Sequence, residues 1–163
     1  MNSAVVKPPA GTLRLCTLRV GKEAFGIDSS VVCEVLGKAL PHAVPRAPRF
    51  VAGVLAYRGE VLLAVSLRAL LGEEDPDGAS SAIVMTDSNS RETFALLVDG
   101  VSDVIEVDAE VWEPNPVALD DRRKALFSGV YRMESRHIVR LESERLQPSR
   151  LAKIFDIEQG ARR

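Results

Sequence analysis

The stretch FVAGVLAYRGEVLL, which runs from Phe50 to Leu63, decides the fold class of this chain. Two apolar segments of strand length flank Arg58-Gly59, and a glycine there supplies the positive φ that a tight hairpin turn needs. A second stretch, FALLVDGVSDVI over Phe94–Ile105, repeats the pattern around Asp99-Gly100. We therefore predict a hairpin turn at Gly59 and another at Asp99-Gly100, in a mainly β protein built twice from such hairpins.

Length and composition limit the class of protein. The 163 residues suffice for one domain with a sizeable core, or for two small barrels that share one. A net charge of -2 gives no field that would attract nucleic acid, and an aromatic content of 5% leaves few rings on which bases could stack. The apolar runs have strand length and residues 1–11 lack a signal-peptide core, so we expect a cytoplasmic protein without direct membrane insertion.

The order of polar and apolar segments predicts the organisation of the chain. Residues 1–11 are expected to form a flexible tail, residues 12–72 a first barrel and residues 82–147 a second, with a polar boundary loop over residues 73–81. Residues 148–163 read as a C-terminal helix and tail, with Ser149 as a candidate cap. The strand Phe94–Val98 is apolar on both faces, which indicates that the other half of the protein covers its second face.

Smaller elements have local signals. Ser66 can cap one helical turn over residues 67–71, and Gly72 stands where a helix ends. The segment after Asp28, residues 31–36, is compatible with a short helix or with a strand. Cys16 and Cys33 lie among apolar residues without a C-x-x-C spacing, so each is interpreted as a small buried side chain.

No arrangement of residues predicts catalysis. His42 and His137 have no metal-binding partner at the usual spacings, so we expect no metal, no cofactor and no enzyme. A hydrolase built on Ser66, His137 and Asp103 has no recognisable motif, so it is the least favoured of the functions considered. A small β-barrel that binds a ligand or an oligonucleotide remains the alternative to a protein adaptor.

Arg58 is the one charged side chain that stands at the tip of an otherwise apolar hairpin. Its planar guanidinium can pair with a carboxylate of its own fold or reach a partner protein. The intramolecular pairing is slightly favoured, and both remain open.

Several short motifs together resemble one protein family. Their order and spacing from Leu13 to Leu146 are similar to those of the CheW-like coupling proteins of bacterial chemosensory arrays. The matching residues are Phe25-Gly26-Ile27-Asp28, Val32-Cys33-Glu34-Val35, Pro45, Pro48, Phe50-Val51-Ala52-Gly53-Val54, Arg58-Gly59-Glu60-Val61, Leu67-Arg68, Leu97-Val98-Asp99-Gly100-Val101-Ser102-Asp103-Val104 and Pro114-Asn115-Pro116.

The resemblance implies a fold and a function. It implies that residues 12–147 form a CheW-like domain of two SH3-like five-stranded β-barrels around a shared hydrophobic core. It also implies an adaptor, recruited to membrane-associated receptor arrays, whose partners are the regulatory domain of a CheA-type histidine kinase and the cytoplasmic tip of a methyl-accepting chemoreceptor. Other CheW-like proteins are further candidate partners. By position in the motifs, the interaction residues would be Val32, Gly53, Arg58, Val101 and Val104.

The sequence also departs from the family pattern. Ala56-Tyr57 replaces the usual Asn-Leu before Arg-Gly, and Leu63-Ala64-Val65-Ser66 replaces Pro-Val-Val-Asp. The last strand closes with Leu141-Glu142 in place of Leu-Asp. These differences suit a coupling protein of an alternative, non-flagellar chemosensory system as well as one of a flagellar system.

Overall fold

The computed structural model describes residues 11–74, 80–87 and 89–160, with side chains described as far as residue 154. Residues 1–10 of the tail expected over residues 1–11, most of the boundary loop and the last three residues lie outside these ranges. No helix of the described part is long and apolar enough to cross a membrane.

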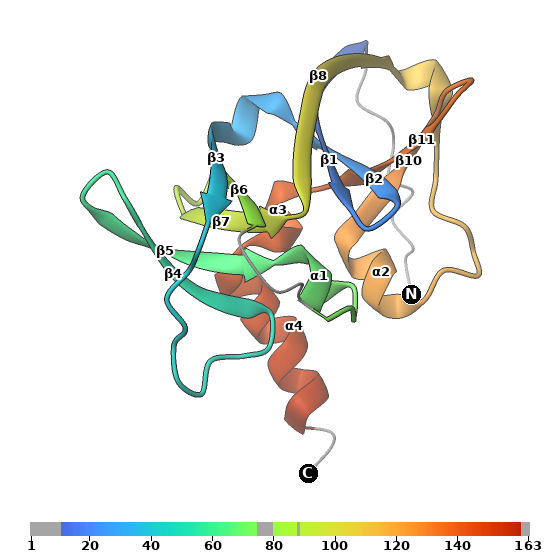
Figure 1. The fold of residues 1–163 in the computed structure, drawn as a ribbon. Helices are drawn as coiled ribbons and strands as arrows, with labels where there is room; N and C mark the ends of the chain where they lie inside the picture. The colour runs from blue at the N-terminus through green and yellow to red at the C-terminus, as the bar shows by residue number, and fades with distance from the viewer. Residues whose placement is uncertain (1–10, 75–79, 88, 161–163) are drawn as a thin grey trace.

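Two sheets make up most of the molecule, as predicted for a mainly β fold (Figure 1). The six-stranded sheet has the order β8-β1-β2-β11-β10-β9, with β1 Thr12–Val20, β2 Glu23–Asp28, β8 Gly100–Asp108, β9 Trp112–Glu113, β10 Phe127–Arg132 and β11 His137–Leu141. The five-stranded sheet has the order β3-β6-β7-β5-β4, with β3 Val32–Ala39, β4 Val51–Tyr57, β5 Glu60–Ser66, β6 Ser80–Thr86 and β7 Thr93–Val98. Short helical segments connect them: η1 Ser29–Val31, α1 Leu67–Leu70, η2 Ala109–Val111, α2 Asp121–Leu126 and α3 Ser143–Leu146, followed by the longer α4 Pro148–Gly160.

The sheets form two subdomains, but they are not the closed five-stranded barrels that the family resemblance implied. One sheet has six strands, and in each sheet the ladder has two ends. An isolated bridge between His42 and Val54 joins the chain after β3 to β4, so the edges of the five-stranded sheet approach each other without forming a continuous ladder.

The sequence predicted one barrel over residues 12–72 and another over residues 82–147, but the two sheets do not divide the chain in this way. Every strand between Val32 and Val98 belongs to the five-stranded sheet, and the six-stranded sheet combines β1 and β2 with β8 to β11. The boundary loop over residues 73–81 therefore connects two segments of the same sheet. A polar loop marks exposure in the sequence, but it does not say which strands pair on either side of it.

The two glycine turns also differ from each other. At Arg58-Gly59 the prediction is confirmed, because both residues have positive φ, 47° and 78°, and β4 pairs antiparallel with β5. At Asp99-Gly100 the predicted hairpin is wrong. β7 and β8 belong to different sheets, and Gly100 does not adopt positive φ, because the chain crosses there from one sheet to the other.

The shared core that was predicted is confirmed. One cluster of buried side chains takes Leu18 and Phe25 from the six-stranded sheet, Leu96 from the five-stranded sheet, and Leu151 from α4. Full burial of each such side chain contributes roughly 1.5–3 kcal/mol. The second apolar face of β7 is thus covered by the other subdomain, as the sequence indicated.

Most local signals have the expected result. The Ser66 hydroxyl accepts a hydrogen bond from the Ala69 amide at 3.1 Å and caps α1, and Gly72 has a φ of 79° after that turn. Residues 32–39 form strand β3, so the strand alternative holds for most of that segment. Ser149 does not cap α4, because the helix already begins one residue earlier, at Pro148. Proline suits the first helical position, where an amide hydrogen would have no partner within the helix.

One charged contact ties the two sheets together. Asp99, where the chain leaves β7, accepts hydrogen bonds from Arg68 Nε and Nη2 at 2.7 and 2.5 Å, and from the amide of Gly21 in the β1–β2 turn at 2.7 Å. The Arg68 guanidinium, followed by the Gly21 amide, lowers the pKa of the Asp99 carboxyl below its ordinary value. Asp99 is therefore a link between α1 and the six-stranded sheet, where the sequence suggested only a turn residue.

Replacing Asp99 tests this link. Asp99→Asn removes the charge from a carboxylate that is 13% exposed, so we expect the free energy of unfolding at pH 7 to fall by about 2 kcal/mol. A lowered folded pKa gives stability that is complete above the ordinary value of about 3.9 and is lost as pH falls through the folded value. Urea unfolding should therefore show a smaller difference between variant and wild type at pH 3 than at pH 7.

Glu106→Gln is the control, because Glu106 is an exposed carboxylate on the neighbouring β8. It should change stability by less than about 0.5 kcal/mol at either pH. An equal loss for Asp99→Asn at both pH values would contradict the charged link.

Candidate partner-binding surface

Val101 and Val104 lie on β8, an edge strand of the six-stranded sheet. A β-bulge determines the face of the sheet to which their side chains point. Across the β1–β8 ladder, Val101 pairs with Leu18 and Val104 pairs with Cys16, so two residues of β8 stand opposite the single residue between them on β1. Residues three apart in a regular strand point to opposite faces, whereas this bulge places both valines on the same face. Val101 packs partly against the shared core, and Val104 is 48% exposed beyond it.

Val32 reaches the same core from the other sheet. It is the first residue of β3, directly after η1, which Asp28 caps by accepting a hydrogen bond from the Ser30 amide at 3.0 Å. Its side chain is partly buried against the shared core, as is that of Val101. We call Val32, Val101 and Val104 the valine surface.

Gly53 has a position that the fold itself explains. It is buried in β4 with a φ of 149°, and a Cβ at this position would lie 2.2 Å from the carbonyl oxygen of His42. The backbones of His42 and Val54 exchange two hydrogen bonds of 2.9 Å beside it. Gly53 thus allows the chain after β3 to approach β4, and it offers no side chain to a partner.

Arg58 projects from the tip of the β4–β5 hairpin. Its side chain is 73% exposed, its Nη2 lies 3.4 Å from Glu34 Oε2, and its guanidinium lies 5.3 Å from the centre of the Tyr57 ring. A hydrogen bond between Tyr57 and Glu34 raises the pKa of the Tyr57 hydroxyl. The favoured intramolecular pairing is therefore present, but an ion pair this exposed is typically weak and can exchange for a partner's carboxylate.

The two cysteines have different environments. Cys16 is buried as predicted, and burial raises the pKa of its thiol. Cys33 is exposed, contrary to the prediction, with its Sγ 3.2 Å from Thr86 Oγ1. Cys33 stands at a shift of the β3–β6 register, where Val32 pairs with Met85 and Glu34 with Val84, so it is the extra residue of a bulge and the alternation of the sequence does not give its direction.

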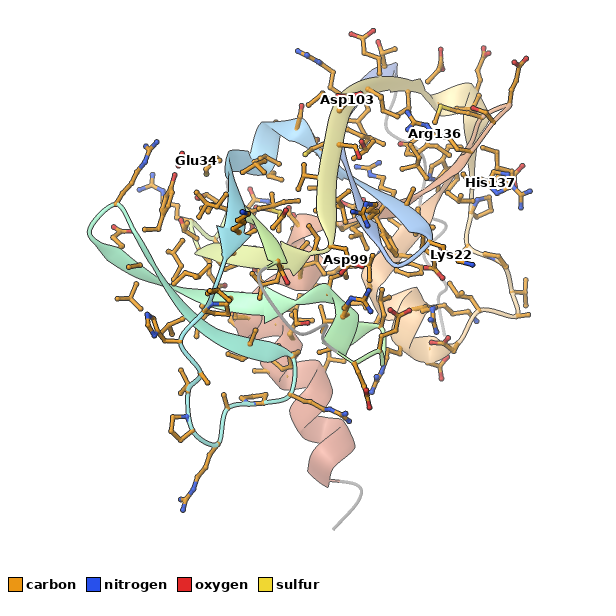
Figure 2. All side chains as sticks on the ribbon, in the orientation of Figure 1. Lys22, Glu34, Asp99, Asp103, Arg136 and His137 are labelled. Carbon is orange, nitrogen blue, oxygen red and sulfur yellow. The ribbon has the colours of Figure 1, made fainter. Side chains whose placement is uncertain are left out.

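The three residues of the hydrolase hypothesis do not come together. Ser66 is buried and caps α1, whereas Asp103 and His137 are exposed on β8 and β11, which β1 and β2 separate (Figure 2). Within the described ranges, no three His, Cys, Asp or Glu side chains are grouped closely enough to hold a metal ion.

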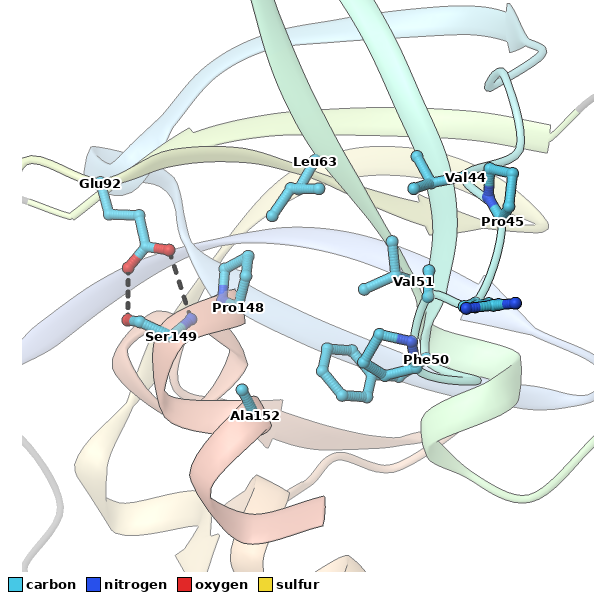
Figure 3. Close-up of a pocket in the computed structure, with 12 residues that line it drawn as sticks. Val44, Pro45, Phe50, Val51, Leu63, Glu92, Pro148, Ser149 and Ala152 are labelled. Carbon is cyan, nitrogen blue, oxygen red and sulfur yellow. Dashed lines mark hydrogen bonds between the residues drawn. The ribbon is translucent and has the colours of Figure 1, made fainter. Parts of the chain in front are cut away.

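A second apolar surface has no counterpart in the sequence predictions. A cavity of about 540 Å³ lies where the proline-rich crossover before β4 meets the start of α4. Phe50, Val51 and Leu63 line it on one side and Pro148 and Ala152 on the other (Figure 3). Local sequence patterns could not reveal it, because its two walls are about a hundred residues apart in the chain.

The surroundings of this cavity, which we call the α4 cavity, are mainly apolar and cationic. Leu63 is 40% exposed, and the carboxylate of Glu92 already accepts hydrogen bonds from the hydroxyl and amide of Ser149, at 2.7 and 3.4 Å. Arg46 lines the cavity. Arg49, three residues further along the chain, is exposed. Neither arginine forms an ion pair with a described side chain.

Comparison with known proteins agrees with this geometry. The model of the CheW-like domain matches residues 14–151, which is most of the chain. The chain belongs to the CheW-like domain family. The resemblance seen in the sequence motifs is thereby confirmed.

Two relatives of this CheW-like protein align over nearly their whole lengths. The "Probable chemotaxis protein CheW" of Rhizobium etli is 30% identical over 146 residues, which cover 90% of this chain and 94% of the relative. The "Chemotaxis protein CheW" of Rhizobium meliloti is 30% identical over 149 residues, which cover 91% and 96%. The fold is also that of the scaffolding protein TtCheW from Thermoanaerobacter tengcongensis, with a TM-score of 0.70 and 22% identity over 79% of this chain and 88% of that one.

The structural role of Gly53 in this CheW-like domain can be measured directly. Gly53→Ala forces a methyl group against the His42 carbonyl at a strained φ, so we expect it to lower the free energy of unfolding by about 2 kcal/mol or more. Gly37→Ala, in exposed β3 with open space around the position, should change it by less than about 0.5 kcal/mol. Equal thermal unfolding of both variants would show that the approach of His42 does not require the glycine.

Proposed function

We propose that this protein is a non-enzymatic adaptor that couples chemoreceptors to a CheA-type histidine kinase in a bacterial chemosensory array. The observation that supports this most is the CheW-like domain over residues 14–151, in a chain whose relatives along nearly their full lengths are named chemotaxis protein CheW. An adaptor needs at least two surfaces for two partners, and the valine surface and the α4 cavity are two candidates. Membership of this array would place the protein in the cytoplasm, beside membrane-bound receptors.

The valine surface is the candidate for the receptor. Val32 and Val101 present apolar area that is backed by the shared core, and Val104 adds an exposed apolar side chain on the face of Val101. Apolar anchors of this kind receive one face of an amphipathic helix, which is the form of a chemoreceptor cytoplasmic tip. Arg58 would add direction by exchanging Glu34 for a carboxylate of the receptor.

The α4 cavity is the candidate for the regulatory domain of the kinase. It is apolar, it includes the exposed side chains of Val44 and Leu63, and Arg46 stands in its wall without an ion pair to a described side chain. Such a cavity fits an apolar anchor of a folded partner that carries an acidic residue beside it. Other CheW-like proteins, as carriers of the same fold, are further candidate occupants of the same surface.

The alternative, a small barrel that binds a ligand or an oligonucleotide, gains no support from the comparisons. Its test is simple, because oligonucleotide binding would weaken steeply as salt rises.

Placing a charge on the valine surface tests the receptor contact. Val104→Lys puts an ammonium where apolar area would be buried, so we expect affinity for the cytoplasmic tip fragment of a chemoreceptor to fall by about tenfold or more. Because Val104 is 48% exposed, the melting temperature should change little. Val117→Lys is the matched control at a valine that is 94% exposed elsewhere, and it should bind as wild type does. Unchanged binding by folded Val104→Lys would remove the valine surface from the proposal.

A charge in the α4 cavity tests the kinase contact. Leu63→Glu should weaken binding of the kinase regulatory domain by about tenfold and leave receptor binding unchanged, because Leu63 lines the cavity. Isothermal titration of one variant with each partner separates the two surfaces. Loss of receptor binding, or retention of kinase binding, would contradict the assignment.

A further inference from the structure

We propose that Thr17 is a positioning residue: its hydroxyl holds the β-bulge of β8 that presents Val101 and Val104 on one face. This inference rests on the proposed function for its biological meaning, since it concerns the surface assigned to the receptor. The effect of Thr17 on the bulge of β8 can be measured without any partner.

The register of the β1–β8 ladder locates the bulge opposite Thr17. Leu18 pairs with Val101 and Cys16 with Val104, so Thr17 alone faces Ser102 and Asp103. A bulge of this type leaves backbone groups of the extra residue outside the ladder, and a carbonyl that loses its ladder partner needs another donor.

Thr17 supplies that donor. Its Oγ1 donates a hydrogen bond of 2.6 Å to the carbonyl oxygen of Asp103, and the residue is only 3% exposed. A buried hydroxyl without a partner is costly, so this threonine and the bulge stabilise each other.

The bulge allows one strand to serve two cores. Before it, Val101 packs against the shared core. After it, Ile105 and Val107 pair with Leu15 and Leu13 and belong to a separate cluster inside the six-stranded sheet. Without the extra residue, keeping the pairing of Ile105 would turn Val101 away from the shared core, and keeping Val101 would turn Ile105 and Val107 outward.

The beginning of β8 is fixed independently. Asp99 is held by Arg68 and the Gly21 amide, and Gly100 lies so close to the Arg19 guanidinium that a Cβ there would be 3.1 Å from its nitrogens. The variable part of the strand is therefore the point at which it bulges, and Thr17 specifies that point.

Two substitutions separate the hydroxyl from the shape of the side chain. Thr17→Val keeps the branched shape and removes the donor, whereas Thr17→Ser keeps the donor. We expect affinity for the cytoplasmic tip fragment of a chemoreceptor to fall about fivefold or more for Thr17→Val and to stay within about twofold of wild type for Thr17→Ser.

Thr93→Val is the matched control, because it removes a threonine hydroxyl that hydrogen-bonds to Thr86 Oγ1 at 2.7 Å in the other sheet. Thr93→Val should lower the free energy of unfolding without changing the affinity for the receptor fragment. Thr17→Val should also leave binding of the kinase regulatory domain unchanged, which distinguishes a local change of β8 from general unfolding.

A structural measurement decides the inference even if the proposed function fails. Nuclear Overhauser contacts between β1 and β8 in the free protein should report the pairs Leu18–Val101 and Cys16–Val104 in wild type and Thr17→Ser, and an altered register or loss of these contacts in Thr17→Val. Retention of both pairs in folded Thr17→Val would overturn the role of Thr17. If no variant, wild type included, bound the receptor fragment, the receptor proposal would fail and these contacts alone would decide whether Thr17 sets the bulge.

Discussion

The two sheets bury one hydrophobic core between them, and every surface of interest depends on that shared burial. Leu18 and Phe25 of one sheet and Leu96 of the other belong to a single cluster that α4 extends through Leu151. A single sheet without the other would leave these side chains exposed to water. The contact of Arg68 with Asp99 and of Asp99 with the Gly21 amide adds a directional link at the point where the chain passes from one sheet to the other.

This arrangement suits an adaptor. Val32 and Val101 rest on the shared core from different sheets, so a partner that contacts both meets a surface whose two parts cannot separate without exposing that core. The α4 cavity lies on other elements, between the crossover before β4 and the start of α4. Two surfaces of modest size give weak individual contacts, and such contacts become strong in an extended array because many of them act together.

The sequence predicted what local chemistry specifies. The Arg58-Gly59 hairpin, the Ser66 cap of α1 and the C-terminal helix each follow from residues within a few positions of one another, and all three are present. Asp99-Gly100 has the same local signal as a hairpin, yet the chain passes there from one sheet to the other, and Asp99 binds Arg68. The division into sheets, the exposure of Cys33 and the α4 cavity depend on pairing between distant segments, which composition and periodicity do not encode. The bulge opposite Thr17 belongs to the same group, since a threonine in an alternating strand gives no sign of the register of its neighbour.

We propose that a receptor helix binds on the valine surface. Methyl NMR of the valine-labelled protein, titrated with the cytoplasmic tip fragment of a chemoreceptor, tests it most directly because each valine reports its own surroundings. We expect the largest shifts at the methyl groups of Val32, Val101 and Val104, with Val117 and Val44 unaffected. Saturable binding whose shifts map to Val44 and the α4 cavity, and leave the three valines unchanged, would contradict it.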